Sequence, residues 1–315
     1  MVFTSRDDGI CIIGGGAVGG VLAYFLYRSG IKHIPVYYAS EESYKEVKNQ
    51  GGVYVYDKKL NEEFLVPVVP RHHETPIDRC FFVFNAVKAY DVPGSLRLTQ
   101  KIAIREGLVI MLQNGFGSLE LAEESIHGTK VAGGVVYYGA ERAKRGRVIY
   151  HGGNVMLVGC RKALCLELLE LTRVFRLGGL DFRVVSDIDY YRWLKLALNA
   201  VVNPMTAVLR ARNKVILEEE GLELARLILR EVCEAAKLQG YELDEERLLA
   251  YVKRNVEAVA DNISSMAQDV VHGKTTEVDY INGYVARTLG KGTSVNHTLT
   301  LLVKLAEKAR NALIE

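Results

Sequence analysis

Several residue types are scarce in this chain of 315 residues, and each scarcity excludes a class of protein. The five cysteines are an odd number, and they form neither a Cys-x-x-Cys pair nor a cysteine–histidine group with zinc-site spacing. A disulfide-rich secreted module and a zinc protein are therefore excluded. We interpret Cys160 and Cys165 as core residues rather than a redox pair, and we expect a cytoplasmic protein with reduced thiols.

An excess of charge of one sign is also lacking. The 40 Lys and Arg residues nearly balance the 38 Asp and Glu residues, for a net charge of +2, and no block of five like charges occurs. Nucleic-acid-binding domains usually carry a strongly basic patch. The composition therefore predicts no nucleic-acid partner.

Residues 9–27 form an uncharged run about as long as a membrane-spanning helix. Six of these nineteen residues are glycines, which is unusual for a spanning helix, and no small-residue cleavage site follows the run. We interpret the run as a buried strand, a turn and a helix, and we expect no membrane association.

The chain is long enough for about two domains, and its halves differ in pattern. From Gly9 to about Val185, short β-rich runs alternate with helical stretches. Continuous apolar runs such as FFVFNAV and LVIMLQ are typical of strands covered on both faces. We predict an α/β, Rossmann-like N-terminal domain over residues 1–186 with a mainly parallel sheet, to which residues 131–160 add antiparallel strands.

After Asp187 the pattern becomes helical, which predicts an all-α C-terminal domain over residues 187–315. We expect Pro204 to end the first helix of this domain, because proline cannot donate the backbone hydrogen bond that continues a helix. The expected helices are 189–203, 215–239, 244–260, 262–272, 276–289 and 296–314.

A glycine-rich turn follows the first apolar run. In GGGAVG, Gly14, Gly16 and Gly19 form the G-x-G-x-x-G pattern, and the helical stretch begins with Ala17 and Val18. The first glycine permits a tight turn, the second lets the backbone approach a pyrophosphate, and the third lets the helix pack on the strand. The amide groups of the helix N-terminus then bind phosphate. The N-terminal half is therefore predicted to bind a dinucleotide.

The residues after the second strand do not decide between NADH and NADPH. An acidic residue about 20 residues beyond the glycine motif is typical of NAD enzymes, and a nearby arginine is typical of NADP enzymes. Here Tyr38, Ala39 and Ser40 occupy this region. Glu41 and Glu42 follow, no arginine is near, and two carboxylates would repel a 2′-phosphate. Ser40 could hydrogen-bond either form, so both cofactors remain open, and we expect NADH to serve at least as well as NADPH.

One predicted helix combines a buried character with a polar stripe. From Trp193 to Val202 nearly every residue is apolar, which is typical of a buried helix. Lys195, Asn199 and Asn203 nevertheless recur at every fourth position and share one face. Asparagine is a poor helix former, and an unpaired buried amide costs about 1–3 kcal/mol. We interpret the stripe as facing a polar ligand; a solvent-exposed face is the alternative.

Polar residues gather at three other places. QNG ends a strongly apolar strand at Gln113–Gly115, and Lys88 follows another strand in NAVKAYD. Ligands of open α/β sheets bind at this carboxyl end of the strands, although polar capping of the strand ends is the alternative. A third cluster lies in NISSMAQDVVHGKTTEVDYING and contains Ser264, Ser265, Gln268, Asp269, Glu277 and Asn282.

These motifs together resemble the ketopantoate reductase family, the 2-dehydropantoate 2-reductases. The resemblance rests on GGGAVG, NAVKAYD, MLQNG, WLKLALNAVVNPMTA, RARN and NISSMAQDV…TTEVDYING, which follow the family's order through most of the chain. It implies an N-terminal Rossmann domain and a helical C-terminal domain, with the active site between them. It also implies reduction of 2-dehydropantoate to pantoate, usually with NADPH, on the route to pantothenate and coenzyme A. The arginine that binds NADP after the family's second strand is missing here.

The resemblance further implies a role for each motif residue. Lys195 would be the general acid, and Glu277 the carboxylate that assists this lysine and the substrate. Lys88 would contact cofactor and substrate, and Ser265 would hold the substrate. The substrate-side amides would be Asn114, Asn199, Asn203 and Asn213, of which Asn114 would also contact the cofactor.

The implied chemistry is coherent for reduction of a 2-oxo acid. Negative charge builds on the ketone oxygen as hydride reaches the carbon, and a positioned ammonium stabilises that charge and donates the proton. This reaction requires no metal. The alternatives are a reductase of another branched 2-oxo acid, a dehydrogenase of the 3-hydroxyacid or glycerol-3-phosphate type, and a dinucleotide sensor without catalysis. The expected partners are a small-molecule 2-oxo acid and, for the helical half, a second copy of the chain in a homodimer.

Overall fold

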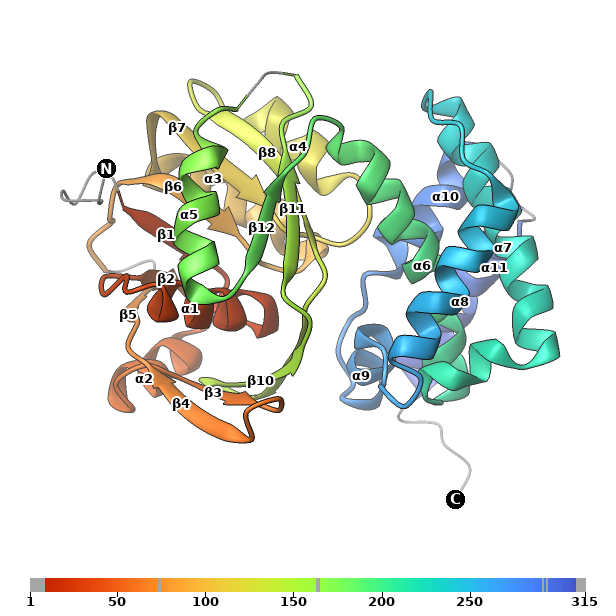
Figure 1. Cartoon of the computed structure of the whole chain (residues 1–315), viewed down its shortest axis with the longest axis horizontal. Coiled ribbons are helices and arrows are strands. Elements are labelled where there is room, and N and C mark those ends of the chain that lie inside the picture. Colours follow the sequence, from red (N-terminus) through yellow and green to blue (C-terminus); the bar gives the residue numbers. More distant parts are fainter. Residues whose placement is uncertain (1–8, 73–74, 163–164, 291, 293, 310–315) are drawn as a thin grey trace. The chain divides into compact units, whose positions relative to one another are not determined.

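The computed structural model describes residues 9–309 except 73–74, 163–164, 291 and 293. The chain forms two compact units (Figure 1). The first contains the residues up to Gln113 together with Ser118–Asp189, and the second contains Asn114–Gly117 and the residues from Tyr190 onward. The predicted boundary lay after residue 186. The observed division instead assigns residues 187–189 to the first unit and the segment Asn114–Gly117 to the second.

An eight-stranded sheet forms the centre of the first unit (Figure 1). Its strand order is β12-β11-β8-β7-β6-β1-β2-β5, and every neighbouring pair is parallel except β8 with β11. The predicted mainly parallel sheet is therefore confirmed, as is an antiparallel addition within residues 131–160. The strands are β1 (Ile10–Ile13), β2 (Pro35–Tyr37), β5 (Val69–Arg71), β6 (Cys80–Asn85), β7 (Ala103–Met111), β8 (Lys130–Val136), β11 (Val155–Gly159) and β12 (Asp181–Val184).

Helices cover both faces of this sheet because its strands are apolar on both sides. Side chains of β1 alternate between two cores: Ile10 and Ile12 join the core of α1 and α5, whereas Cys11 and Ile13 join the core of α3 and α4. The helices of this unit are α1 (Ala17–Arg28), α2 (Glu41–Asn49), α3 (Val92–Ile102), α4 (Ser118–Ser125) and α5 (Leu168–Gly178), with the short 3-10 helix η2 (Ala89–Asp91).

A second sheet of four strands lies beside α1, with its strands in the order β4-β3-β10-β9. Its inward residues Val53, Val55 and Val148 belong to the same core as α1. Strands β4, β5 and β12 were not predicted, because these short strands are partly exposed and lack a continuous apolar run. The strands of this sheet are β3 (Val53–Asp57), β4 (Glu62–Val66), β9 (Gly139–Lys144) and β10 (Arg147–Gly152).

The second unit is helical over its described residues, as the pattern after Asp187 predicts. Its core includes Trp193 and the apolar residues of α6, which pack with aliphatic side chains of α7, α8 and α10. The helices are α6 (Ile188–Leu209), α7 (Glu219–Leu238), α8 (Glu245–Ala258), α9 (Ser265–Val271), α10 (Asn282–Leu289) and α11 (Val295–Lys308), with the 3-10 helices η3 (Asn213–Leu217) and η4 (Val278–Tyr280).

The predicted end of the first helix at Pro204 is wrong, because α6 continues to Leu209. Proline lacks the N–H that would bond the carbonyl of the fourth residue before it. That carbonyl belongs to Ala200, and the buried side chain of Asn282 donates to it at 2.9 Å. Asn282 also donates to Asn296 at 2.9 Å, so a second side chain orients it. The tertiary hydrogen bond satisfies the carbonyl that proline leaves unpaired, and the helix passes through the proline.

The expectation of reduced, unpaired cysteines is also wrong. Cys11 of β1 is bonded to Cys80 at the start of β6, and Cys160 is bonded to Cys165. The Cα atoms of the two pairs are 6.0 and 6.1 Å apart, a usual separation for a disulfide. Because Cys11 and Cys80 are 69 residues apart, their link closes a long loop and contributes about 4 kcal/mol in the chain-entropy model. Cys233 is the remaining free thiol.

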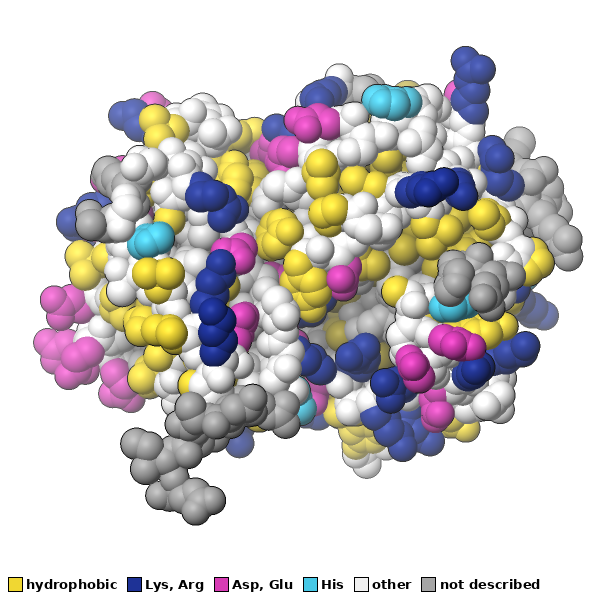
Figure 2. All heavy atoms as spheres, turned by 180° about the vertical axis from the view of Figure 1, so that it is seen from behind, with side chains coloured by type: hydrophobic (Ala, Val, Ile, Leu, Met, Phe, Trp, Pro, Cys, Tyr) yellow, Lys and Arg dark blue, Asp and Glu magenta, His cyan; other side chains and the backbone are white. Residues whose placement is uncertain are grey.

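The surface carries charges of both signs. Figure 2 shows acidic and basic side chains on both units, in keeping with the balanced composition. Within the described residues, no helix is both long and apolar enough to cross a membrane. The uncharged run at residues 9–27 instead forms β1, the glycine turn and most of α1, as predicted.

Candidate active site

The glycine turn between β1 and α1 has the shape that the motif predicts. Gly14 has a φ of +98°, and a Cβ there would lie 2.8 Å from the backbone nitrogen of Val87. A Cβ on Gly19 would collide with the carbonyl oxygen of Gly14, so glycine is required where the helix packs on the turn. Gly16 instead faces open space, since no atom lies within 4 Å of its Cβ position. The turn therefore leaves room for a ligand to approach the backbone at Gly16.

The first turn of α1 fits the pyrophosphate of a dinucleotide. Gly16 is the N-cap and offers no side-chain acceptor, and the turn that begins with Ala17 and Val18 carries no acidic residue. Its backbone N–H groups are therefore available to a phosphate, whose negative charge a helix N-terminus favours. Tyr38 also fits a bound ligand, because its buried hydroxyl lies over Gly15 and has no hydrogen-bond partner among the described residues. A ribose or phosphate oxygen would supply the missing acceptor.

The carboxyl ends of β1 and β6 place Lys88 close to this turn. Ile13 of β1 is opposite Asn85 of β6, and Lys88 follows three residues later at the start of η2. Gln113 holds the same edge, since its amide donates to the side-chain oxygen of Asn85 and to the carbonyl of Val87, both at 3.0 Å. The predicted cofactor residue Lys88 thus lies at the strand ends where ligands of open sheets bind.

Ser40 is engaged by the helix that follows it. As the N-cap of α2, its Oγ accepts the N–H of Ser43 at 3.2 Å. The same hydroxyl donates to Glu42 at 2.6 Å. A cofactor contact of Ser40 would therefore compete with two existing hydrogen bonds, and this contact stays a prediction.

The polar stripe of α6 is buried. Asn199 and Asn203 are 7% and 5% exposed, and Lys195 is half-buried one turn before them. Burial lowers the pKa of Lys195 to about 8, because an ammonium in poorly hydrated surroundings loses solvation. The side-chain amide of Asn203 makes no hydrogen bond with the described residues. These observations argue against a solvent-exposed face and favour a ligand along the stripe.

Three predicted residues meet in one buried cluster. The side chain of Asn114 donates to a carboxylate oxygen of Glu277 at 3.0 Å, and its own oxygen accepts from Asn199 at a longer 3.4 Å. Glu277 is 6% exposed. Because a carboxylate only accepts hydrogen bonds, Glu277 determines which way the Asn114 amide faces. The cluster joins the stripe of α6 to the segment that precedes η4.

Backbone packing brings Asn114 to Glu277. The N–H of Phe116 donates to the carbonyl of Tyr280 at 3.0 Å, and Tyr280 ends the 3-10 helix that begins just after Glu277. Gly115 has a φ of +79°, and the carbonyl of Tyr280 occupies the space that a Cβ would need. Only glycine allows this approach of two backbones.

Two predicted substrate residues make no hydrogen bond to this cluster among the described residues. Asn213 donates from its side chain to the carbonyl of Val259 at 3.1 Å and from its backbone to the carbonyl of Asn262 at 3.0 Å. It therefore supports the loop between α8 and α9. Ser265 is exposed at the first residue of α9. The structure records no hydrogen bond from Asn213 or Ser265 to the stripe of α6, so their contact with a substrate stays a prediction.

The sequence analysis missed an aromatic cluster beside the site. The ring of Phe116 contacts Trp193 and Tyr284, with centroids 4.6 and 5.0 Å apart, and the guanidinium of Arg192 lies over it at 4.0 Å. Arg192 also donates to the carbonyl of Gly115 at 3.4 Å. These contacts hold the segment Asn114–Gly117 within the helical unit. The sequence places this phenylalanine between two glycines in NGFGS.

Known proteins share both units of this chain. The family models "Ketopantoate reductase PanE/ApbA" and "Ketopantoate reductase PanE/ApbA C terminal" match residues 10–163 and 187–307. A 2-dehydropantoate 2-reductase of Archaeoglobus fulgidus is 32% identical over 309 residues, covering 96% of this chain and 99% of the relative. The chain belongs to the ketopantoate reductase family. It is accordingly an NAD(P)H-dependent oxidoreductase.

Solved structures agree with the ketopantoate reductase fold. A PanE/ApbA family ketopantoate reductase from Ralstonia eutropha has a TM-score of 0.84 at 24% identity, covering 96% of this chain and 99% of that one. A D-mandelate dehydrogenase in complex with NADH and anilino(oxo)acetate has a TM-score of 0.87 at 21% identity, with the same coverage. The predicted Rossmann-like unit followed by a helical unit is thereby confirmed. In the described part of the chain, no three His, Cys, Asp or Glu side chains are grouped to hold a metal ion.

Replacing Gly115 by alanine tests whether this ketopantoate reductase needs Asn114 in its cluster. The new Cβ would collide with the Tyr280 carbonyl, so we expect kcat/KM to fall about a hundredfold. Gly117→Ala is the matched control, because its φ is also positive (+102°) but the nearest atom to its Cβ position is 3.8 Å away. Steady-state kinetics should show a loss below about fivefold for this control. Equal losses in the two variants would contradict the proposed role of the close approach.

Proposed function

We propose that the chain reduces 2-dehydropantoate to pantoate with NADH or NADPH, on the route to pantothenate and coenzyme A. The observation that carries this proposal is the buried stripe of α6, where a lysine of lowered pKa is followed by two buried amides. The family supports it, since the relative from Archaeoglobus fulgidus carries the name of this reaction. The bound dinucleotide supplies a hydride to the ketone carbon of the substrate.

Lys195 is the proposed general acid. As the new C–H bond forms at C2, the electron pair of the C=O bond moves to oxygen, and the Nζ ammonium gives that oxygen a proton. The product is the C2 alcohol, and the neutral amine then takes a proton from water. A pKa of about 8 suits this step, because the lysine is protonated at neutral pH and donates more readily than an ordinary lysine.

The asparagines are the proposed substrate contacts. Asn203 lies two turns beyond Lys195 with its amide unbonded among the described residues, so it suits the hydroxyl of the substrate. Asn199 and Asn114 present further amide groups, which Glu277 orients through Asn114. The family resemblance supports additional contacts, from Lys88 and Asn114 to the cofactor, and from Asn213 and Ser265 to the substrate.

Turnover with a panel of 2-oxo acids tests the proposed reaction. Oxidation of the reduced cofactor, followed by its absorbance, should be at least about tenfold more efficient with 2-dehydropantoate than with other branched 2-oxo acids. Turnover with the other acids alone would contradict the substrate while keeping the reaction type. Cofactor binding without any oxidation would contradict catalysis and favour a dinucleotide sensor.

We place this enzyme in the cytoplasm, where reduced nicotinamide cofactors are available. We also propose a homodimer, which exposed leucines of α11 at positions 301, 302 and 305 support as a contact surface. No nucleic-acid or membrane partner is proposed.

A further inference from the structure

Basic residues gather at the edge of the sheet where an adenosine ribose would bind. β2 and β5 are parallel neighbours with Tyr37 opposite Arg71, so the residues after both strands share one edge. In dinucleotide-binding folds, the segment after the second strand contacts the ribose and distinguishes NADH from NADPH. Lys45 lies one turn after Glu41 in α2, and Arg145 of the turn between β9 and β10 is close enough to Glu42 for its charge to lower the pKa of that carboxyl.

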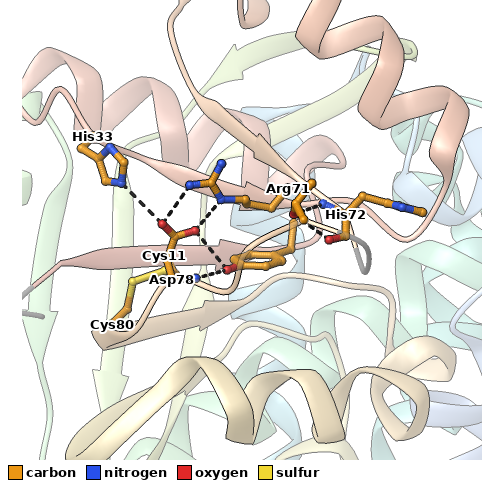
Figure 3. A network of polar contacts seen from close by, with 8 residues as sticks. Cys11, His33, Arg71, His72, Asp78 and Cys80 are labelled. Carbon is orange, nitrogen blue, oxygen red and sulfur yellow. Dashed lines mark hydrogen bonds and ion pairs between the residues drawn. A yellow bond between two sulfur atoms is a disulfide. The ribbon is translucent and has the colours of Figure 1, made fainter. Parts of the chain in front are cut away.

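Arg71 is already neutralised by a carboxylate of the chain. Its Nε and Nη2 donate to the two oxygens of Asp78 at 2.6 and 3.0 Å, as Figure 3 shows. The hydroxyl of Tyr37 also donates to Asp78 at 3.1 Å, and His33 approaches it at 3.7 Å. Burial would raise the pKa of the Asp78 carboxyl, but the hydrogen bonds and charge of Arg71 outweigh burial and lower this pKa. The guanidinium of Arg71 is therefore paired with the Asp78 carboxylate at neutral pH.

Lys45 pairs with a carboxylate of α2, and the charge of Arg145 acts on another. Glu41 accepts from Lys45 at 2.7 Å, and this hydrogen bond lowers the pKa of the Glu41 carboxyl. The hydrogen bond from Ser40 is the main cause that lowers the pKa of the Glu42 carboxyl, to which the charge of Arg145 also contributes. Both glutamates are therefore charged at neutral pH and lie in the first turn of α2.

The N-terminus of α2 is thus occupied by the chain's own groups. Ser40 accepts one of the free amide N–H groups of the helix, and Glu41 and Glu42 provide the negative charge that a helix N-terminus favours. Tyr38, which directly follows β2, is neutral and buried, so it brings no positive charge to a phosphate dianion. A 2′-phosphate would have to displace Glu41 from Lys45 and would be repelled by Glu42, whereas a 2′-hydroxyl would not.

We infer that Glu41 and Glu42 make this site select NADH over NADPH, because they place negative charge at the N-terminus of α2 and Glu41 pairs with Lys45, the cation that a 2′-phosphate would need. This inference rests on the proposed function only in that the chain binds a nicotinamide dinucleotide. It names two specificity-determining residues. The family resemblance alone implies the opposite preference.

Separate dissociation constants for NADH and NADPH test the inference without catalysis. Titrations of the full chain, followed by fluorescence of the reduced cofactor, should show tighter binding of NADH to the natural sequence. The double variant Glu41→Gln/Glu42→Gln should bind NADPH about tenfold more tightly, with NADH affinity changed by less than about twofold. Each single variant should show part of the gain, about threefold, which keeps the test decisive if the double variant is unstable.

Glu46→Gln is the matched control for charge. Glu46 is an exposed residue of the same helix, one turn beyond the N-terminus, and its replacement should leave the ratio of the two constants unchanged. Tighter binding of NADPH by the natural sequence would overturn the inference, as would an unchanged ratio in the double variant. Binding of neither dinucleotide would overturn the proposed function, and the selectivity with it.

Discussion

Lys195→Ala should lower kcat for 2-oxo acid reduction by about a thousandfold or more. The alanine removes both the proton donor and the positive charge that stabilises the developing alkoxide, and each effect is large in a poorly hydrated site. The glycine turn that fits the pyrophosphate belongs to the other unit, so the dissociation constant for NADH should change by less than about twofold. Steady-state kinetics and a cofactor titration on the same preparation measure both quantities.

Lys237→Ala is the control for this variant, because Lys237 is an exposed residue of α7 in the same helical unit. Its kcat should match that of the natural sequence. An unchanged kcat in Lys195→Ala would remove this lysine from the mechanism. A large loss of NADH affinity would show instead that Lys195 acts mainly in cofactor binding.

Glu277→Gln should lower kcat/KM by about 10- to 100-fold. The change keeps the size of the side chain but removes the charge that accepts the N–H of Asn114 at 3.0 Å. A glutamine can both donate and accept, so it no longer determines which way the Asn114 amide faces. The Asn114 amide, which we propose as a substrate contact, is then free to rotate so that its oxygen and nitrogen exchange places.

Asp279→Asn provides the comparison for Glu277. Asp279 lies two residues away in η4, but its carboxylate is exposed and pairs with Lys304 at 2.7 Å. Exposed ion pairs contribute little, so this variant should retain nearly full kcat/KM. Similar losses in both variants would show that the segment responds to any lost charge, and would contradict a specific role of Glu277 in orienting Asn114.

The features that the sequence predicts well are those that depend on local spacing. The glycine turn follows from Gly14, Gly16 and Gly19, because a strand, a tight turn and a helix leave a pattern within a few residues. The buried stripe of α6 follows from Lys195 and the two asparagines at every fourth position, because four residues make about one helical turn.

Features that depend on residues distant in sequence could not be predicted in this way. Asn114 and Glu277 are 163 residues apart, and their hydrogen bond depends on the close approach of Gly115 to a carbonyl. The continuation of α6 through Pro204 depends on an amide from Asn282, which is 82 residues away from the carbonyl that it satisfies. Tertiary hydrogen bonds of this kind override a local rule, and the local pattern contains no sign of them.

The pairing of Cys11 with Cys80 has a similar cause. The two residues lie on the neighbouring strands β1 and β6, so their proximity follows from the strand order. An odd cysteine count and the absence of a Cys-x-x-Cys motif carry no information on that proximity. Few cysteines therefore do not imply reduced thiols in this chain.

The central claim is that Lys195 protonates the ketone oxygen, and the pH dependence of kcat tests it most directly. A general acid acts only while protonated, and burial lowers the pKa of this lysine to about 8. With saturating cofactor and 2-dehydropantoate, kcat should therefore be level from about pH 6 to 7 and fall about tenfold per unit well above pH 8. A kcat that stays level or rises up to about pH 10 would contradict the assignment of Lys195 as the proton donor.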